Sequence, residues 1–523
     1  MQPGSDAWRS AYEVGERYEA TLDPDARDRG AHYTPPDVAE QLVERALEAW
    51  GRGAPIVCDP SCGGGAFLVA AAEQLRRRGI DPATVVERHV VGVDLDAGAV
   101  AAAREALTVW ARSYGVLIAT PRVILADGLS GGLPQVVGHV DVVVGNPPFQ
   151  SQLAGSTTRT TAERDALAAR FGALARGYVD SAAIFVAASI GLVGSGGVVT
   201  LIQPQSFLVA RDARAVREAV IAAGSLTSVW VPGEQVFAAS VDVCAVTVRV
   251  GPPGASTAVV VGGRDGSVRL GQIKHAELSG APTWSPVWAA AQGVPTVGTQ
   301  SGGVVADLAS ATAGFRDEYY GLIPHITDER PTDGRRLVTT AMIDPANDGW
   351  SIRPVRIGGT GRVAPWLDCA ALAEADARLA RWVDRLSVPK VLVATQTRVV
   401  EAVADPAGDA VPLTPVIAVV PNDPADVLRL EAALLAPAAT AWALRRFGGG
   451  AMSASGLKLA ARQVLEIPLP NDREAWEEGV AHLREPSEWR QFGALMSRAW
   501  GLHGPEADDL VEWWLDRGRT SLK

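Results

Sequence analysis

Residues 142–151 read VVVGNPPFQS, so an apolar run ends at an amide, two prolines and an aromatic ring. Proline has no backbone N–H and a fixed φ, so the pair ends any preceding strand. The prolines Pro147 and Pro148 hold a carbonyl outward, where it and the Asn146 side-chain oxygen can accept from both N–H groups of one planar amine. Such acceptors localise the nitrogen lone pair, which is catalysis by positioning and electrostatics. Phe149 can stack on a flat base.

A second motif, DPSCGGGAFL at 59–68, lies between an expected strand and an expected helix. Glycines at such a turn let the backbone approach a ligand, and the helix N-terminus offers N–H groups to it. The spacing is not Gly-x-Gly-x-x-Gly, which disfavours a dinucleotide as the ligand. Asp59 ends the strand, where its carboxylate can accept hydrogen bonds from a ligand amine or from water.

Two more carboxylates follow the next two expected strands. Asp94 ends VVGVD, where an acidic side chain can accept from both hydroxyls of a ribose. Asp127 follows the next strand in LADGL, where it can accept from an exocyclic amine such as adenine N6. Each alone could be a solvated strand-end aspartate. Three carboxylates at the ends of successive parallel strands, around one glycine turn, predict a pocket for an adenosine-containing ligand.

The elements that position these side chains lie within residues 55–250, where β-branched runs alternate with helical patterns. Continuous apolar strands separated by helices indicate a parallel sheet buried on both faces. We therefore predict a doubly wound α/β domain with a mostly parallel, seven-stranded sheet. Strands are expected at 55–60, 90–96, 122–129, 141–145, 198–204, 226–231 and 241–250. Helices are expected at 66–79, 97–115, 181–193 and 211–223.

The alternation stops after the loop GPPGAS at 251–256. We expect residues 1–253 to hold an N-terminal helix and the α/β domain, and residues 254–523 to form a second, mixed α+β domain that ends in helices. Its expected elements are β-like runs at 390–400 and 411–420, a helix at 425–447 and helices from about residue 473.

The composition of the 523 residues, 47% hydrophobic and 20% charged, fits a globular protein with real cores. Apolar runs are broken well before the roughly 18 residues that span a membrane, and the N-terminus does not resemble a signal peptide. Four cysteines are too few for a disulfide framework, and no His or Cys cluster completes a metal site beside Cys58 and Cys62. We therefore expect a cytoplasmic protein without a membrane partner or a metal.

The formal net charge of −11 argues against a protein that coats nucleic acid through bulk attraction, although it leaves room for a local basic groove. Lysine occurs only at positions 274, 390, 458 and 523, so the positive charge is almost entirely arginine. Arginine makes bidentate contacts to phosphate and guanine, but a GC-rich genome produces the same bias.

Asp-Pro-Ser-Cys-Gly-Gly-Gly-x-Phe-Leu followed by Asn-Pro-Pro-Phe resembles the gamma-class S-adenosylmethionine-dependent DNA adenine-N6 methyltransferases. GAHYTPPDVAEQLV at 30–43 is similar to that family's leading motif, and VGERYEATL at 14–22 to a short helix that precedes it. The resemblance is strong over 10–250. It continues more weakly to about residue 470, where the order of segments looks like a target-recognition domain. Phe149 stands where tyrosine is more frequent and retains the stacking surface.

The resemblance implies a class I methyltransferase fold, S-adenosylmethionine as the cofactor without a metal, and methyl transfer to N6 of a flipped adenine in double-stranded DNA. It implies a restriction-modification or phage-defence setting and leaves separate nuclease or defence-system subunits open as partners. The implied catalytic residues are Asn146, Pro147, Pro148 and Phe149, and the implied contacts to the flipped base are Phe149 and Phe237. The implied cofactor contacts are Tyr33, Thr34, Pro35, Asp59, Pro60, Cys62, Gly63, Gly65, Phe67, Asp94, Leu95, Asp127, Gly128 and Asn146.

Two other functions stay open on the sequence alone. Asn-Pro-Pro-aromatic motifs also serve methylation of an RNA amine or a protein glutamine amide, because those nitrogens are planar and weakly nucleophilic too. Such enzymes usually lack a C-terminal domain of this length. A binding or specificity subunit with a decayed catalytic part is the third reading, and the intact motif residues argue against it. The sequence shows no Pro-Asp…Asp/Glu-x-Lys nuclease pattern, so we expect methylation without cleavage by this chain.

Overall fold

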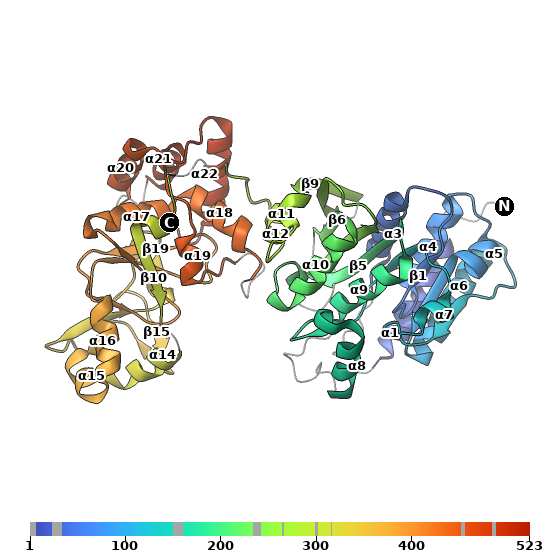
Figure 1. The fold of residues 1–523 in the computed structure, drawn as a ribbon, viewed down its shortest axis with the longest axis horizontal. Helices are drawn as coiled ribbons and strands as arrows, with labels where there is room; N and C mark the ends of the chain where they lie inside the picture. Colours follow the sequence, from blue (N-terminus) through green and yellow to red (C-terminus); the bar gives the residue numbers. More distant parts are fainter. Residues whose placement is uncertain are drawn as a thin grey trace. The chain divides into compact units, whose positions relative to one another are not determined.

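The computed structural model describes residues 7–22, 34–149, 161–233, 242–263, 266–298, 302–314, 316–450, 456–483 and 488–522. The chain divides into two compact units, Met1–Ala291 and Gln292–Lys523 (Figure 1). The expected domain boundary after residue 253 falls inside the first unit, because the sheet of that unit continues past it.

Over the described residues, the sheet of the first unit has nine strands in the order β3-β2-β1-β4-β5-β7-β6-β8-β9. The pairs among β3, β2, β1, β4 and β5 are parallel, and β7 runs antiparallel to both of its neighbours. The first seven of these strands are the seven strands expected from the sequence. Bounds are β1 Val57–Asp59, β2 Val90–Asp94, β3 Arg122–Leu125, β4 Val142–Gly145, β5 Val198–Pro204, β6 Gly224–Pro232, β7 Val243–Val250, β8 Ser256–Gly263 and β9 Gly266–Lys274.

The expected number of seven strands is too low, because β8 and β9 extend the sheet beyond β6. β8 pairs parallel to β6 and buries Val259 and Val260, and β9 pairs antiparallel to β8. The apolar run in STAVVVGG thus completes the first unit instead of starting the second.

Aspartate side chains cap the N-termini of α6 and α9 in the first unit. Asp96 accepts a hydrogen bond from the N–H of Ala99 at the start of α6, and Asp180 accepts one from Ala182 at the start of α9. Bounds of the helices are η1 Ala7–Arg9, α1 Ser10–Ala20, α3 Pro36–Trp50, α4 Ala66–Arg77, α5 Pro82–Thr84, η2 Val85–His89, α6 Ala97–Ser113, α7 Leu133–Val137, α8 Thr161–Phe171, η3 Gly172–Ala175, α9 Ser181–Val193, η4 Gln205–Leu208, η5 Arg211–Ala213, α10 Arg214–Ala223, α11 His275–Leu278 and α12 Ser285–Ala291.

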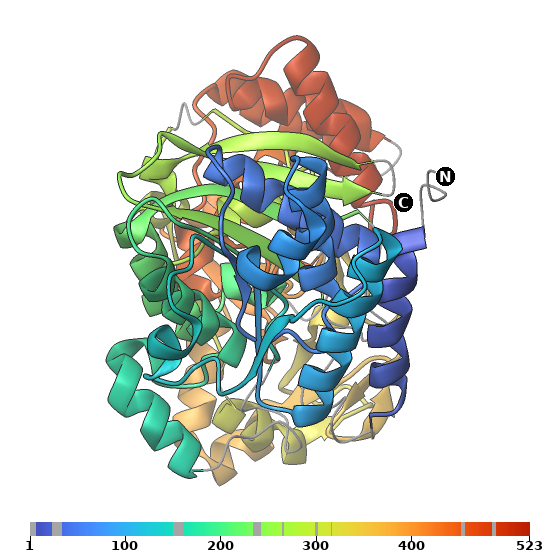
Figure 2. The same ribbon diagram turned by 90° about the vertical axis from the view of Figure 1, so that its right-hand side faces the viewer.

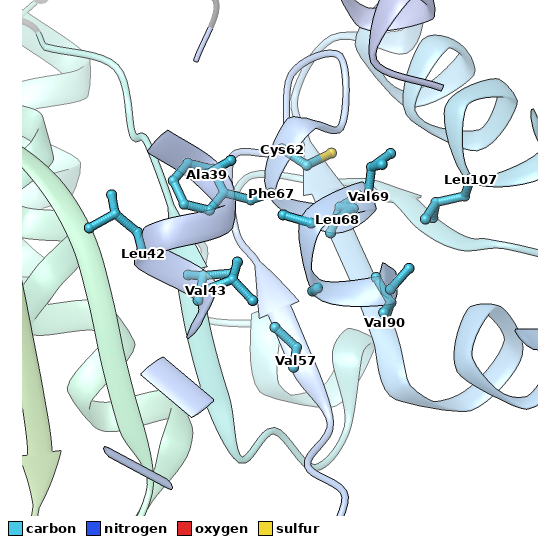
Figure 3. Close-up of a cluster of buried hydrophobic side chains, with 14 of the residues drawn as sticks. Ala39, Leu42, Val43, Val57, Cys62, Phe67, Leu68, Val69, Val90 and Leu107 are labelled. Carbon is cyan, nitrogen blue, oxygen red and sulfur yellow. The ribbon is translucent and has the colours of Figure 1, made fainter. Parts of the chain in front are cut away.

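Helices cover both faces of this sheet. Right-handed crossovers put α4 and α6, which lead from β1 out to β3, on one face and α9, which leads from β4 to β5, on the other. Figure 2 shows the blue and the green helices on opposite sides of the strands. Figure 3 shows the apolar cluster on the α4 face, where Leu42 of α3 and Phe67 of α4 lie beside Val57 of β1. This packing fixes the carboxyl ends of the strands in space.

The second unit is mixed α+β, with two four-stranded sheets of order β10-β21-β18-β19 and β11-β17-β12-β20 and two hairpins among its described residues. Bounds of its strands are β10 Ala309–Ala313, β11 Ile326–Thr327, β12 Gly334–Val338, β13 Ile343–Asp344, β14 Asn347–Asp348, β15 Val355–Ile357, β16 Thr360–Arg362, β17 Trp366–Asp368, β18 Lys390–Val393, β19 Ala402–Asp405, β20 Ala410–Pro412 and β21 Ile417–Pro421. Bounds of its helices are α13 Val305–Leu308, α14 Arg316–Leu322, η6 Ile323–His325, η7 Thr340–Met342, α15 Cys369–Ala375, α16 Ala377–Leu386, η8 Pro424–Asp426, α17 Val427–Leu435, α18 Pro437–Phe447, α19 Ala461–Leu465, α20 Arg473–His482, α21 Trp489–Ala499 and α22 Pro505–Arg517.

The helix expected at 425–447 is broken between α17 and α18. Pro437 has no N–H to donate and its ring clashes with the preceding turn, so the chain bends by 64° there. Within the described part of the chain, no single helix is long and apolar enough to cross a membrane, and this bent pair meets that test only when its two helices are taken together.

A buried ion pair joins two strands of the second unit. The Lys390 ammonium, on β18, donates to the Asp405 carboxylate, on β19, at 2.6 Å, and both side chains are almost fully buried. Burial lowers the pKa of Lys390, and the neighbouring Asp405 opposes that shift.

Candidate functional site

A cavity of about 670 Å³ lies at the carboxyl ends of the central strands of the first unit. Asp59 at the end of β1, Asp94 at the end of β2, Asp127 after β3 and Asn146 after β4 all line it. The carboxyl edge of an open α/β sheet is where such folds bind ligands, and the volume is within the range of about 300–1,000 Å³ that is usual for ligand pockets. The structure therefore brings together the four side chains that the sequence singled out.

The glycine-rich turn between β1 and α4 forms one wall. Gly63 and Gly65 adopt positive φ angles of 50° and 91°, which a side chain disfavours. Gly64 touches α1, because a Cβ on Gly64 would lie 2.5 Å from the Cα of Gly15. Two glycine backbones in contact thus set α1 directly against the turn.

The Asp59 carboxylate is enclosed between this turn and the end of β4. Only 1% of Asp59 is exposed, and its Oδ1 accepts a hydrogen bond from the Ser61 N–H at 3.0 Å. Burial raises the pKa of Asp59 to about 8, with a further contribution from the charge of Asp94. A Cβ on Gly145 would lie 2.6 Å from Asp59 Oδ1, so β4 must carry glycine here.

The next carboxylates are tied to the backbone and to α1. Asp94 accepts from the N–H groups of Gly63 and Asp96, both at 2.9 Å, while burial raises its pKa. The Tyr18 hydroxyl, from α1, donates to Asp96 Oδ1 at 2.7 Å, which lowers the pKa of Asp96 and helps to raise that of Tyr18. These bonds hold Asp94 beside the glycine turn, with one wall of the cavity supplied by α1.

Asn146 presents a buried acceptor that no described residue satisfies. Its Nδ2 donates to Thr34 Oγ1 at 3.1 Å, which fixes the amide. Its Oδ1 is buried and, among the described residues, has no hydrogen-bond partner; the Ser61 hydroxyl, also in the lining, is in the same state. Buried polar atoms are nearly always paired in folded proteins, so two orphaned atoms on one cavity wall fit a polar ligand.

Helix α9 supports the rest of the Asn-Pro-Pro-Phe motif through a hydrogen bond. The Ser181 hydroxyl, at the start of α9, donates to the Pro148 carbonyl at 2.6 Å. Pro148 lines the cavity together with Asn146, whereas Pro147 is buried and outside the lining. Phe149 is half-buried against the apolar cluster of the sheet and is also outside the lining. Ser181 thus acts as a support for the turn that carries Asn146.

Most of the predicted cofactor contacts line the cavity. The others lie outside its lining or outside the described residues. Pro35 and Gly65 are not in the lining. Tyr33 and Phe237 lie outside the described residues. The predicted residues that do line the cavity are Thr34, Asp59, Pro60, Cys62, Gly63, Phe67, Asp94, Leu95, Asp127, Gly128 and Asn146.

Two groups of lining residues were absent from the sequence prediction. The first is the end of α1 and the turn after it, with Tyr18, Glu19 and Leu22, whose segment had been singled out without a role in the site. The second is one face of α8, where Glu163, Ala166, Leu167 and Arg170 recur at helical spacing. That spacing was visible in the sequence, but only the fold shows what the face meets. Among the described residues no cluster of His, Cys, Asp or Glu could hold a metal ion.

Comparison with known families identifies the segment that builds this cavity. Residues 9–259 match the family model N-6 DNA Methylase. This matched segment, just under half of the chain, contains β1 to β7 and every residue that lines the cavity.

Two curated relatives match parts of the chain. The Type II methyltransferase M.MamI of Microbacterium ammoniaphilum is 32% identical over 129 residues, which are 23% of this chain and 34% of that protein. The Type II methyltransferase M.VspI of Vibrio sp. (strain 343) is 28% identical over 211 residues, which are 40% of this chain and 45% of that protein. The match thus spans between a third and a half of the length of these relatives.

Two solved structures share the fold over nearly the whole chain. The Type IIL restriction-modification enzyme MmeI in complex with DNA is similar with a TM-score of 0.57 and 13% identity, over 97% of this chain and 81% of that chain. The type IIG restriction endonuclease BpuSI is similar with a TM-score of 0.50 and 14% identity, over 97% of this chain and 68% of that chain. At such identities the likeness concerns the fold, and it extends from residues 9–259 into the second unit.

Proposed function

We propose that this chain is a gamma-class DNA methyltransferase that uses S-adenosylmethionine to methylate N6 of adenine in double-stranded DNA. The observation that carries the proposal is the Oδ1 of Asn146, which has no partner among the described residues. The Asn146 amide is fixed by Thr34 at the carboxyl end of β4, beside three strand-end carboxylates. The match of residues 9–259 to the N-6 DNA Methylase family supports it.

The residues of the cavity suit the cofactor. Asp94 would accept from the ribose hydroxyls and Asp127 from the adenine amine, while the glycine turn lets the backbone lie close to the ligand. The exposed side chain of Leu95 offers an apolar surface for the base. S-adenosylmethionine, when bound, supplies a methyl group on a positively charged sulfur, which needs no further activation.

Asn146 is proposed to bind the amine that accepts the methyl group. Its Oδ1 would accept one N–H of the target amine, and a backbone carbonyl of the Asn-Pro-Pro-Phe turn the other. Because the amide is already fixed by Thr34, it does not reorganise when charge develops on the amine nitrogen. Phe149 and Phe237 are proposed to contact the base.

A base inside a duplex cannot reach this cavity, so the proposal includes base flipping. The second unit is proposed as the target-recognition domain that contacts DNA and selects the site. Restriction-modification or phage defence is the proposed setting, supported by the restriction-modification enzymes that share the fold.

A transfer assay tests the proposal. The full chain is incubated with tritiated S-adenosylmethionine and, in parallel, with duplex DNA, RNA or a protein extract, and recovered DNA is read by single-molecule sequencing. We expect label in DNA alone, as N6-methyladenine in one sequence context. Label in RNA or in protein glutamine, or S-adenosylmethionine binding without any transfer, would overturn the proposal.

A further inference from the structure

Glu19, at the end of α1, is a carboxylate beside the glycine-rich turn, and the proposed reaction does not yet use it. Glu19 lines the cavity, and its Oε1 lies 3.6 Å from where a Cβ of Gly63 would stand. The Gly15–Gly64 contact fixes α1 at this distance, and the hydrogen bond from Tyr18 to Asp96 fixes the C-terminal end of α1. Glu19 is therefore placed by the fold.

The carboxylates at the strand ends each accept hydrogen bonds from backbone N–H groups and have further lone pairs for a ligand. Asp59 accepts from Ser61, Asp94 from Gly63 and Asp96, and Asp127 from Leu129 at 2.8 Å. Asp59 is also enclosed, and burial raises its pKa to about 8. Position along the ligand therefore decides which carboxylate meets which group.

The order of the strands sets the direction of an adenosine ligand in the cavity. The sheet order β3-β2-β1-β4 puts Asp127 on one side of Asp94 and the glycine turn on the other. A ribose at Asp94 with its base toward Asp127 must send its 5′ substituent past Gly63. Glu19 is the carboxylate that lies against Gly63 there.

We propose that Glu19 binds the α-ammonium group of the amino-acid moiety of an S-adenosyl amino acid. This inference rests on the proposed function and extends it to a residue on α1 with no role in the sequence motifs. A carboxylate and an ammonium group form a charge-assisted hydrogen bond, which is about twice as strong as a neutral one. Glu19 thereby distinguishes an S-adenosyl amino acid from adenosine derivatives that lack the amino acid.

The experiment compares two ligands on one set of variants by isothermal titration calorimetry of the full chain. S-adenosylhomocysteine carries the amino-acid moiety, and 5′-methylthioadenosine carries the same adenosine and thioether without it. We expect Glu19→Gln to weaken S-adenosylhomocysteine by about tenfold to a hundredfold, as for the loss of a charged hydrogen bond. Binding of 5′-methylthioadenosine should change by less than about twofold.

Two matched variants control for the loss of charge and for the position of the carboxylate. Glu16→Gln makes the same charge change on an exposed residue of α1 outside the lining and should leave both ligands unaffected. Glu163→Gln changes the lining carboxylate of α8 and should not reproduce the selective loss. If Glu19→Gln fails to fold, Glu19→Asp, which retains the charge one methylene back, should show a smaller loss of the same selectivity.

Several outcomes would overturn the inference. They are an equal weakening of both ligands in the Glu19 variants, no weakening of either, or a selective loss in Glu163→Gln instead. A wild-type protein that binds S-adenosylhomocysteine but transfers no methyl group to DNA would contradict the proposed function and leave the titration valid. Unchanged binding by Glu19→Gln in an active methyltransferase would contradict only the role of Glu19.

Discussion

Replacement of Asn146 by alanine is the most direct perturbation of the proposed chemistry. The change removes the buried Oδ1 that has no partner among the described residues and also the Nδ2 that donates to Thr34. The truncated atoms border the cavity, so the change enlarges an existing space and leaves no sealed void. The sheet and the strand-end carboxylates stay in place.

The size of each expected effect follows from the two Asn146 atoms, Oδ1 and Nδ2, that the substitution removes. Loss of a preorganised group that stabilises developing charge lowers kcat by roughly a hundredfold to a thousandfold. Loss of one hydrogen bond to Thr34 lowers the free energy of unfolding by about 0.5–1.5 kcal/mol. The affinity for S-adenosylhomocysteine should change by less than about fivefold, or about 1 kcal/mol, because the variant retains Asp94 and the glycine turn.

Three measurements separate these effects: tritium transfer from S-adenosylmethionine to DNA, titration with S-adenosylhomocysteine, and urea unfolding. Thr34→Val is the matched control, because it removes the hydrogen bond that fixes the amide and leaves Oδ1 in place. We expect Thr34→Val to lower kcat by about tenfold or less, as expected from the loss of one supporting hydrogen bond. Near wild-type transfer by Asn146→Ala would refute the acceptor role, and a loss of binding equal to the loss of transfer would reassign Asn146 to cofactor binding.

Three further perturbations test the packing around the site and in the second unit. Gly145→Ala puts a Cβ 2.6 Å from Asp59 Oδ1, so we expect a loss of about 1–3 kcal/mol in urea unfolding, and an unchanged midpoint would contradict that contact. Because the pKa of Asp59 is raised to about 8, its contribution to stability is fully present below about pH 4 and is lost as the pH rises to about 8. The fall in wild-type stability between pH 5 and 8 should therefore be shallower in Asp59→Asn, and parallel pH curves would refute the shift. Lys390→Met removes the ammonium that donates to the buried Asp405 and leaves Arg336, 3.7 Å away, as the remaining cation beside that carboxylate. The change should cost about 3 kcal/mol, whereas the exposed Lys458→Met should stay within about 0.5 kcal/mol by the same unfolding assay.

The parts of the fold that sequence reasoning could reach are those with local signals. The strand that ends at Gly145 was visible because apolar β-branched residues run into two prolines, and helix α9 because an apolar run follows Asp180. The strand-end carboxylates follow from the same patterns, because the carboxyl ends of parallel strands share one edge. The break at Pro437 had a local signal too, and the apolar periodicity on both sides of it outweighed that signal in the prediction.

The parts of the fold that could not be predicted from the sequence depend on contacts between distant segments. The pairing of β8 with β6 decides that Ser256–Gly263 belongs to the first unit, and no local pattern encodes a partner strand. Gly15, in the middle of α1, is an unfavourable helix residue by propensity, and its reason for being glycine is the backbone of Gly64. The supporting bond from Ser181 to Pro148 likewise joins residues that only the folded sheet brings together.

The contact between Gly15 and Gly64 makes α1 part of the pocket as well as part of the core. A fragment that begins at Thr34 would retain β1 to β7 but would lose Ala11, Tyr12 and Val14 of α1, which are buried in the core of the first unit. It would lack Tyr18 and Glu19, and the cavity would be open to solvent along the glycine turn. A loss of ligand binding by such a fragment would combine a missing cavity wall with a disturbed core. For this chain, truncations designed from the sheet alone are therefore a poor guide to the smallest functional unit.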